Sequence, residues 1–213
     1  MNAQREYQHP WIIRITHWVN FIALGIMVTS GLRIYNASPL FDVRIPSQLT
    51  LGGWLGGARQ WHFFAMWILF LNGAIWVVYN VFSKHGRATT LFSRKDIVGV
   101  LPMVKYYLRI LKQHPAVRKY NSLQKLAYTI APFLALGSVL SGIAIYWPVQ
   151  FSGITSIFGN FDAARMWHFR FMVTLLLFFS GHLLMVAIAG WNNFLSMITG
   201  WKKSSGPIQP PMK

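Results

Sequence analysis

The sequence predicts an all-α integral membrane protein, a four-transmembrane-helix bundle, and three observations support this fold class. Hydrophobic residues make up 54% of the 213 residues, whereas charged residues make up only 11%, against about 25% in an average soluble protein. Four apolar runs are each long enough to cross a bilayer as a helix, which takes about 20 residues. The basic residues gather between these runs in a pattern that gives the four helices one consistent orientation.

The apolar runs define the expected elements of a single membrane domain, residues 1–213. We predict membrane spans at about 11–32, 60–82, 123–147 and 165–188. The first run begins after Pro10, which favours the first turn of a helix. It is long, carries Arg14 and His17 near its start and lacks a clean small-residue cleavage site, so we interpret it as a membrane helix and not as a secretory signal.

A further helix is predicted between the second and third spans, at about 94–112. Ser93 and Asp96 have the spacing of a helix N-cap and the acidic residue that pairs with it. Pro102 falls inside the segment, so we expect a kink or break there. Apolar residues recur at helical spacing, at Ile97, Leu101, Val104, Leu108 and Leu111. This pattern predicts an amphipathic helix on the membrane surface with its basic side chains toward lipid headgroups; the alternative is a helix packed on neighbouring loops.

The distribution of basic residues predicts the orientation of the spans. The chain has 20 Lys and Arg against 4 Asp and Glu. Fifteen of the basic residues lie in the N-terminal segment, between spans two and three or after span four; the other five are Arg33, Arg44, Arg59, Arg165 and Arg170. Positive charge favours the cytoplasmic side, so we expect both termini to be cytoplasmic. Because the basic residues lie between apolar spans, they indicate membrane topology and anionic lipid, not nucleic acid.

The absence of cysteine narrows the possible redox chemistry. The chain has no Cys, which excludes covalent c-type haem, cysteine-ligated iron–sulfur clusters, zinc thiolate sites and disulfides. Any redox cofactor must therefore be held without covalent attachment, by other side chains. Histidine is the strongest candidate ligand, and the chain has seven.

Four of the histidines fall at two matching depths of the predicted bundle. His168 and His182 are fourteen residues apart in the fourth span, which on a helix separates them by about 21 Å on nearly one face. With alternating span directions, His17 lies on the cytoplasmic side with His182. His62, at the start of the second span, lies on the outer side with His168.

Such pairs of histidines predict two haems. A polar imidazole inside a membrane is costly unless a partner binds it, and haem iron commonly takes histidine ligands. We predict an inner haem between His17 and His182 and an outer haem between His62 and His168. A single histidine at a membrane edge is more often an interfacial or hydrogen-bonding residue. Metal transport is the main rival for the set of four, but it usually needs carboxylates inside the spans, and all four acids lie outside them: Glu6, Asp42, Asp96 and Asp162.

Three arginines accompany these histidines at a fixed spacing. Each lies three residues upstream of a predicted ligand, on the same helix face: Arg14, Arg59 and Arg165. Arginine binds carboxylates through two parallel hydrogen bonds, so we expect these side chains to bind the haem propionates. Glycines in the spans offer places where a macrocycle could approach a helix backbone: Gly25, Gly31, Gly73, Gly137, Gly142 and Gly181. The remaining histidines, His9, His85 and His114, are expected in tails or loops facing solvent.

These motifs together resemble the prokaryotic cytochrome b-561 superfamily. The first span contains RITHW, the second begins with WHF, and the fourth has WHF followed fourteen residues later by GH. The resemblance covers about residues 9–202. Members of this family include the membrane b subunits of nickel–iron hydrogenase, formate dehydrogenase and thiosulfate reductase. In the family one histidine from each of the first two helices and two from the fourth bind two b haems, which implies the ligands His17, His62, His168 and His182.

The resemblance also implies a place and a role. The chain would lie in the bacterial inner membrane and pass electrons between a partner oxidoreductase and membrane quinone. It is most similar to b subunits that accompany molybdopterin oxidoreductases related to sulfite oxidase. Arg14, Asn20 and the region around His182 are candidate hydrogen-bond donors to the quinone.

The alternative function is a stand-alone superoxide:quinone oxidoreductase, resembling the small members of the family that work without a partner. In that case the five arginines of the outer side would steer an anion to the outer haem. The chain is longer than such an enzyme needs, which favours the partnered function.

Overall fold

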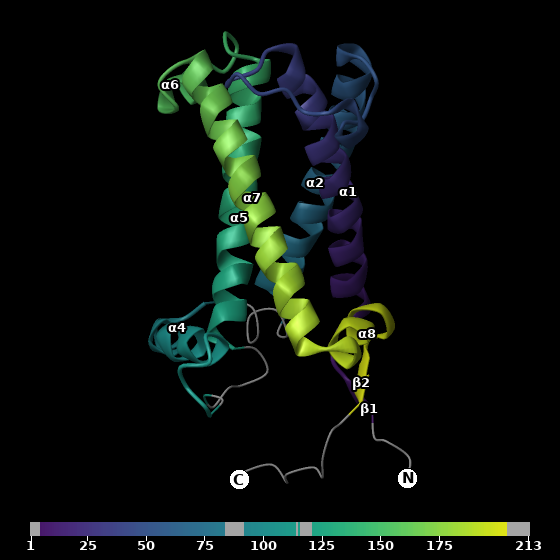
Figure 1. Cartoon of the computed structure of the whole chain (residues 1–213), viewed down its shortest axis with the longest axis vertical. Coiled ribbons are helices and arrows are strands. Elements are labelled where there is room, and N and C mark those ends of the chain that lie inside the picture. The colour runs from purple at the N-terminus through teal and green to yellow at the C-terminus, as the bar shows by residue number, and fades with distance from the viewer. Residues whose placement is uncertain (1–4, 84–91, 114, 116–120, 204–213) are drawn as a thin grey trace. The chain divides into compact units, whose positions relative to one another are not determined.

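The computed structural model describes residues 5–83, 92–113, 115 and 121–203 (Figure 1). Four of its helices are long and apolar enough to cross a membrane: α1 (Trp11–Ala37), α2 (Leu55–Phe82), α5 (Ser122–Tyr146) and α7 (Phe161–Ala189). They contain the four predicted spans almost completely. The predicted all-α integral membrane fold with four spans is therefore confirmed.

Shorter elements fill the connections. These are β1 (Arg5–Tyr7), the 3-10 helix η1 (Ser47–Leu49), α4 (Arg94–Tyr107), α6 (Ser152–Ile157), α8 (Trp191–Thr199) and β2 (Trp201–Lys203). The described chain divides into two compact units, one formed by Met1–Trp76 with Ser180–Lys213 and the other by Val77–Phe179. The boundaries fall inside α2 and α7, so each of these helices contributes to both units. The units are described separately below.

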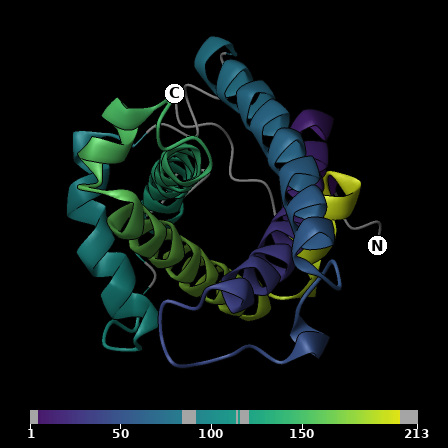
Figure 2. The same ribbon diagram turned by 90° about the horizontal axis from the view of Figure 1, so that it is seen from above.

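In the first unit, buried polar side chains connect α1 to the first part of α2, and the two helices run side by side in Figure 2. The Asn72 side-chain nitrogen donates to the Thr16 carbonyl at 2.8 Å and to Asn20 Oδ1 at 2.7 Å. Asn72 is only 6% exposed. An amide in an apolar environment needs such partners, so this cluster fixes where α2 contacts α1.

The two ends of the chain meet in the same unit. β1 pairs with β2 in antiparallel register, with Arg5 opposite Lys203. The backbone N–H groups of Gln8 and His9 donate to the Gly200 carbonyl at 2.8 and 3.3 Å. Gly200 has φ +87°, a left-handed conformation that suits glycine and ends α8. This turn brings the last described residues back beside the start of α1 (Figure 1).

This pairing corrects the prediction that His9 faces solvent. His9 is buried, with 7% of its surface exposed. The neighbouring strands β1 and β2 are only three residues long, too short to show the alternating pattern by which a strand is recognised from sequence. His85 and His114 lie outside the described residues.

In the second unit, α4 packs on the first turns of α5 (Figure 1). Met103 is buried at this contact, with 1% of its surface exposed, and a Cβ added at Gly99 would collide with the Ser122 hydroxyl. Ile97 and Leu101 are both 60% exposed and point away from the contact. The predicted amphipathic helix is present, with Pro102 inside it. It ends at Tyr107 rather than near 112, because Arg109 adopts φ +60°, which no α-helix accommodates.

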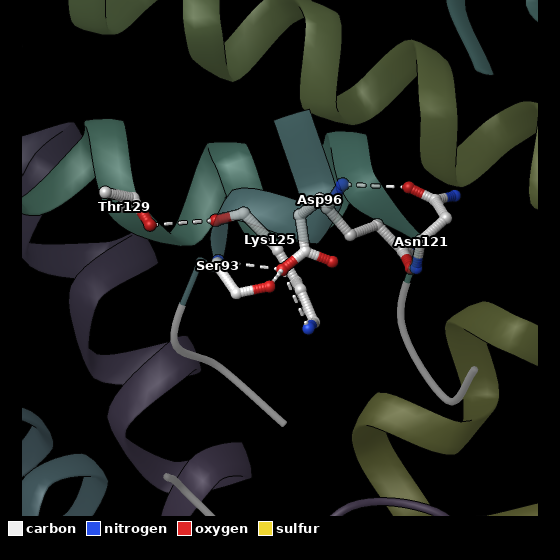
Figure 3. Close-up of polar contacts among 6 residues, drawn as sticks. Ser93, Asp96, Asn121, Lys125 and Thr129 are labelled. Carbon is white, nitrogen blue, oxygen red and sulfur yellow. Dashed lines mark hydrogen bonds and ion pairs between the residues drawn. The ribbon is translucent and has the colours of Figure 1, made fainter. Parts of the chain in front are cut away.

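The predicted N-cap of this helix is also confirmed and gains a partner from α5. The Asp96 carboxylate accepts hydrogen bonds from the Ser93 backbone N–H at 2.8 Å and the Ser93 hydroxyl at 2.6 Å. Lys125 Nζ lies 3.1 Å from the same oxygen (Figure 3). Asn121 caps α5 in turn by accepting from the Gln124 backbone N–H at 2.8 Å. The starts of both helices are thereby fixed to each other.

The ion pair predicts a pH dependence for the α4–α5 contact. Burial raises the pKa of the Asp96 carboxyl, but hydrogen bonds from Ser93 and Lys125 outweigh it and hold the pKa below its ordinary value of 3.8. A depressed pKa stabilises the folded state above the unfolded pKa, and this contribution disappears as pH falls through the folded pKa. We expect Asp96→Asn to lose about 1 kcal/mol at pH 7 and to show a flatter pH dependence below pH 4 than the wild type.

The measurement is hydrogen exchange of the α4 amides, corrected for intrinsic exchange rates, in the wild type and in Asp96→Asn. Asp162→Asn is the matched control, because Asp162 is exposed and its pair with Arg165 is a weak one at 3.5 Å within one helix. Equal pH profiles of α4 protection in the wild type and in Asp96→Asn would contradict the assignment.

Candidate functional site

The two histidines predicted for the inner level meet in the first unit. His17 is in the second turn of α1, and His182 lies in the last two turns of α7. Their ring centroids are 6.0 Å apart, with the ring planes at 58°. An imidazole–metal bond is about 2 Å long, so two imidazoles on opposite sides of one metal ion have their centroids about 6 Å apart. The observed separation fits a metal bound by both rings.

The chemistry of the donor set indicates what kind of metal group fits. Among the residues that the structure describes, no three or more His, Cys, Asp or Glu side chains cluster in a way that could hold a metal ion. A metal ligated by His17 and His182 therefore takes its other ligands from elsewhere. A porphyrin supplies four nitrogen ligands in one plane and leaves two axial positions, which histidines commonly fill.

The surroundings of His17 come from α8, which sequence reasoning did not connect with this site. Trp18 packs edge-on against the His17 ring, with centroids 5.4 Å apart. The Trp18 indole N–H donates to the Met197 carbonyl at 3.2 Å. One Arg14 guanidinium nitrogen donates to the Ile198 carbonyl at 2.6 Å. The last turn of α8 thus holds the start of α1 in place, and Arg14, predicted as a propionate ligand, lies at this junction.

His62 is held by α1 within the first unit. Its Nδ1 lies 3.1 Å from the Met27 carbonyl oxygen and 3.1 Å from Ser30 Oγ. Ser30 is fully buried, and its hydroxyl donates to the Ile26 carbonyl one turn earlier at 2.5 Å. A Cβ added at Gly31 would lie 3.3 Å from His62 Cε1, so the ring packs closely on the helix at a position where glycine leaves room for it.

His168 is held in the same way by α5 within the second unit. Its Nδ1 lies 2.9 Å from the Ser138 carbonyl oxygen and 3.0 Å from Ser141 Oγ. Ser141 is fully buried and donates to the Gly137 carbonyl at 2.7 Å. A Cβ added at Gly142 would lie 3.4 Å from His168 Cε1. Each contact of the His62 site has a counterpart here.

The sequence around the two sites repeats accordingly. α1 carries Ser30-Gly31-Leu-Arg-Ile-Tyr35, and α5 carries Ser141-Gly142-Ile-Ala-Ile-Tyr146. The histidine segments share the pattern A-R-x-W-H-F-x-x-M, which begins at Ala58 and at Ala164. Both alanines have no exposed surface. The serines were missed as site residues, although this internal repeat could have revealed them.

The hydrogen bonds fix which ring nitrogen is available for a metal. A backbone carbonyl can only accept, so an Nδ1 atom beside the Met27 or Ser138 carbonyl carries the proton. The neutral ring then has its lone pair on Nε2, which is the nitrogen that binds a metal. His62 and His168 therefore have the tautomer of a metal ligand.

The remaining predicted site residues are two arginines and the glycines of the spans. Arg165 lies 3.5 Å from Asp162 and 6.0 Å from the Phe161 ring centroid. Arg59 is exposed at the start of α2. Among the six predicted glycines, Gly31 and Gly142 face the histidine rings, and a Cβ added at Gly137 would lie 2.5 Å from Phe171 Cζ. A Cβ at Gly25, Gly73 or Gly181 would meet nothing within 4 Å.

Residues 8–200 match the family described as prokaryotic cytochrome b561. The match covers all four spans and all four predicted ligand histidines, and the chain belongs to this family. It is a cytochrome b561-family subunit that transfers electrons in the membrane, binds haem b, and lies as a multi-pass protein in the bacterial inner membrane.

One relative extends the comparison over nearly the whole chain. It is the Azospira oryzae protein named "Putative protein-methionine-sulfoxide reductase subunit YedZ1". The two sequences are 41% identical over 192 residues, which cover 90% of this chain and 96% of the relative. The relative therefore has nearly the same length and extent as this chain.

Proposed function

We propose that this chain binds two b haems and passes electrons between membrane quinone and a partner reductase. His17 and His182 would hold the inner haem, and His62 and His168 the outer haem. The single observation that supports this most directly is the 6.0 Å separation of the His17 and His182 rings, which come from residues 165 positions apart in the chain. Haem supplies reversible one-electron transfer when it is bound.

The residues of the chain would hold and tune these groups. α8 fixes the depth of His17 by hydrogen bonds from Trp18 and Arg14 to its last turn. α1 and α5 fix the tautomers of His62 and His168. Arg59 and Arg165 would contribute positive charge at the outer level, which favours the reduced iron. With both termini cytoplasmic, the electrons would cross most of the bilayer between the two haems.

The partner follows from the relative. The Azospira protein is named as a subunit of a protein-methionine-sulfoxide reductase, and its sequence is similar over almost its full length. We infer that this chain serves a reductase of the same class, which would be a molybdopterin enzyme. Quinone would supply the electrons, and Asn20, held by Asn72 at 2.7 Å three residues after His17, is the candidate donor to a quinone carbonyl. The relative's name favours this function over the stand-alone superoxide oxidase.

The experiment is a reduced-minus-oxidised spectrum of the purified protein, with haem quantified as the pyridine haemochrome. We expect two b haems per chain, reduced by a quinol and reoxidised when the purified reductase and methionine sulfoxide are added. If the reductase oxidised the haems but no quinol reduced them, the quinone assignment would be contradicted. If superoxide reduced the haems and the reductase with methionine sulfoxide did not oxidise them, the stand-alone enzyme would be favoured.

A further inference from the structure

We infer that Ser30 and Ser141 are a matched pair of positioning residues, each of which sets the reduction potential of the haem iron that its own histidine would bind. This inference rests on the proposed function, because it requires that His62 and His168 ligate iron. It adds a role for two residues of α1 and α5 that carry no metal-binding group themselves.

Each serine hydroxyl is fixed as an acceptor toward its histidine. A serine has one hydroxyl proton, and both serines direct it at the carbonyl of their own helix four residues earlier, Ile26 at 2.5 Å and Gly137 at 2.7 Å. Their oxygen lone pairs are thereby left to accept the histidine Nδ1–H. Neither serine can turn away, because both are fully buried.

The histidine proton is consequently shared between two acceptors. At His62 these are the Met27 carbonyl and Ser30 Oγ, both at 3.1 Å. At His168 they are the Ser138 carbonyl at 2.9 Å and Ser141 Oγ at 3.0 Å. An acceptor on Nδ1–H increases electron density on Nε2 and strengthens its bond to a metal. A more basic ligand stabilises the oxidised iron and lowers the reduction potential.

The glycine that follows each serine leaves room for the histidine ring beside the serine hydroxyl. An added Cβ would lie 3.3 Å from the ring Cε1 at Gly31, which is a tight contact, and 3.4 Å from it at Gly142, which is about van der Waals contact. The serine and the glycine are adjacent in both helices. One turn of helix therefore supplies an acceptor for the histidine Nδ1–H and a surface without a side chain on which the ring packs. The same pair occurs in two units, which indicates a selected arrangement rather than a chance contact.

The test uses redox titrations of Ser30→Ala, Ser141→Ala and the double variant, followed by optical spectroscopy. Loss of one of two acceptors is expected to shift the reduction equilibrium of one haem up to tenfold toward the reduced state. For a one-electron couple a tenfold change corresponds to a rise of about 59 mV. Each single variant should move the transition of the haem that its own histidine would bind, and the double variant should combine the two shifts.

Matched controls come from neighbouring hydroxyl groups. Thr29→Val removes a hydroxyl that donates to the Gly25 carbonyl at 2.8 Å. Ser138→Ala removes one that donates to the Leu134 carbonyl at 3.0 Å, while leaving the Ser138 carbonyl beside His168. Both controls should keep the wild-type potentials. In Ser30→Thr and Ser141→Thr the threonine hydroxyl can still donate to the same carbonyl and accept from the histidine. These variants should keep the wild-type reduction potential, and they replace an alanine variant that loses haem.

His17→Ala identifies the transitions, because it should remove the inner haem and leave the outer one. Unchanged potentials in both alanine variants, with two haems still bound, would overturn the role of the serines and leave the di-haem proposal intact. Two haems retained in both His62→Ala and His168→Ala would instead overturn the ligand assignment on which the inference rests.

Discussion

The double substitution His168→Ala with His182→Ala is expected to remove both haems while leaving the chain inserted in the membrane. The two residues lie fourteen positions apart in α7 and would supply one ligand to each haem. An imidazole replaced by a methyl group leaves iron with one protein ligand, which is too few to retain a non-covalent haem of the bis-histidine type. The measurement is the pyridine haemochrome, with the expected content falling from two haems per chain to none.

The four single histidine variants should show which haem each histidine binds. His17→Ala and His182→Ala should each leave one haem, and it should be the same one, because their rings face each other at 6.0 Å. His62→Ala and His168→Ala should each leave the other. His85→Ala is the matched control and should retain both. Two haems in the double variant would show that other residues ligate iron, whereas an uninserted chain would show that the histidines are needed for folding.

Gly52→Ala is expected to destabilise the first unit more than any other glycine substitution in its connecting loop. Gly52 has φ +106°, a conformation that alanine adopts only with strain. An added Cβ would also collide with the backbone N and Cα of Ala58, which is fully buried in α2. Backbone atoms cannot rotate out of the way. We expect a loss of about 3 kcal/mol or more in the free energy of unfolding.

The neighbouring glycine separates the two causes. Gly53 has φ +70°, but a Cβ there would meet nothing within 4 Å. Gly53→Ala should therefore cost only the strain of the left-handed conformation, about 1 kcal/mol. Denaturant unfolding in detergent, followed by circular dichroism, measures both variants. Since His62 is one turn after Ala58, Gly52→Ala should also lower haem content, and equal stabilities of the two variants would contradict the proposed clash.

The four membrane helices and the N-cap of α4 could be predicted from local sequence features alone. A span requires only length and apolar character, which are local properties, so the four spans agreed with α1, α2, α5 and α7 to within a few residues at most ends. The N-cap at Ser93 was equally local, because its partner Asp96 is three residues away. The meeting of His17 with His182 followed from helical rise and alternating span direction, without any tertiary contact being known.

The partners of the site residues depend on how distant segments pack together, and could not be predicted from the sequence. His9 is buried where its backbone N–H donates to the Gly200 carbonyl, next to two three-residue strands from opposite ends of the chain. The attachment of α8 to Arg14 and Trp18 uses backbone carbonyls, which every residue possesses and no sequence pattern marks. Ser30 and Ser141 resemble ordinary small residues of membrane helices until the histidine that each one contacts is known. Hydrophobic periodicity is a property of the sequence of one helix, whereas hydrogen bonds between helices depend on how two helices pack together.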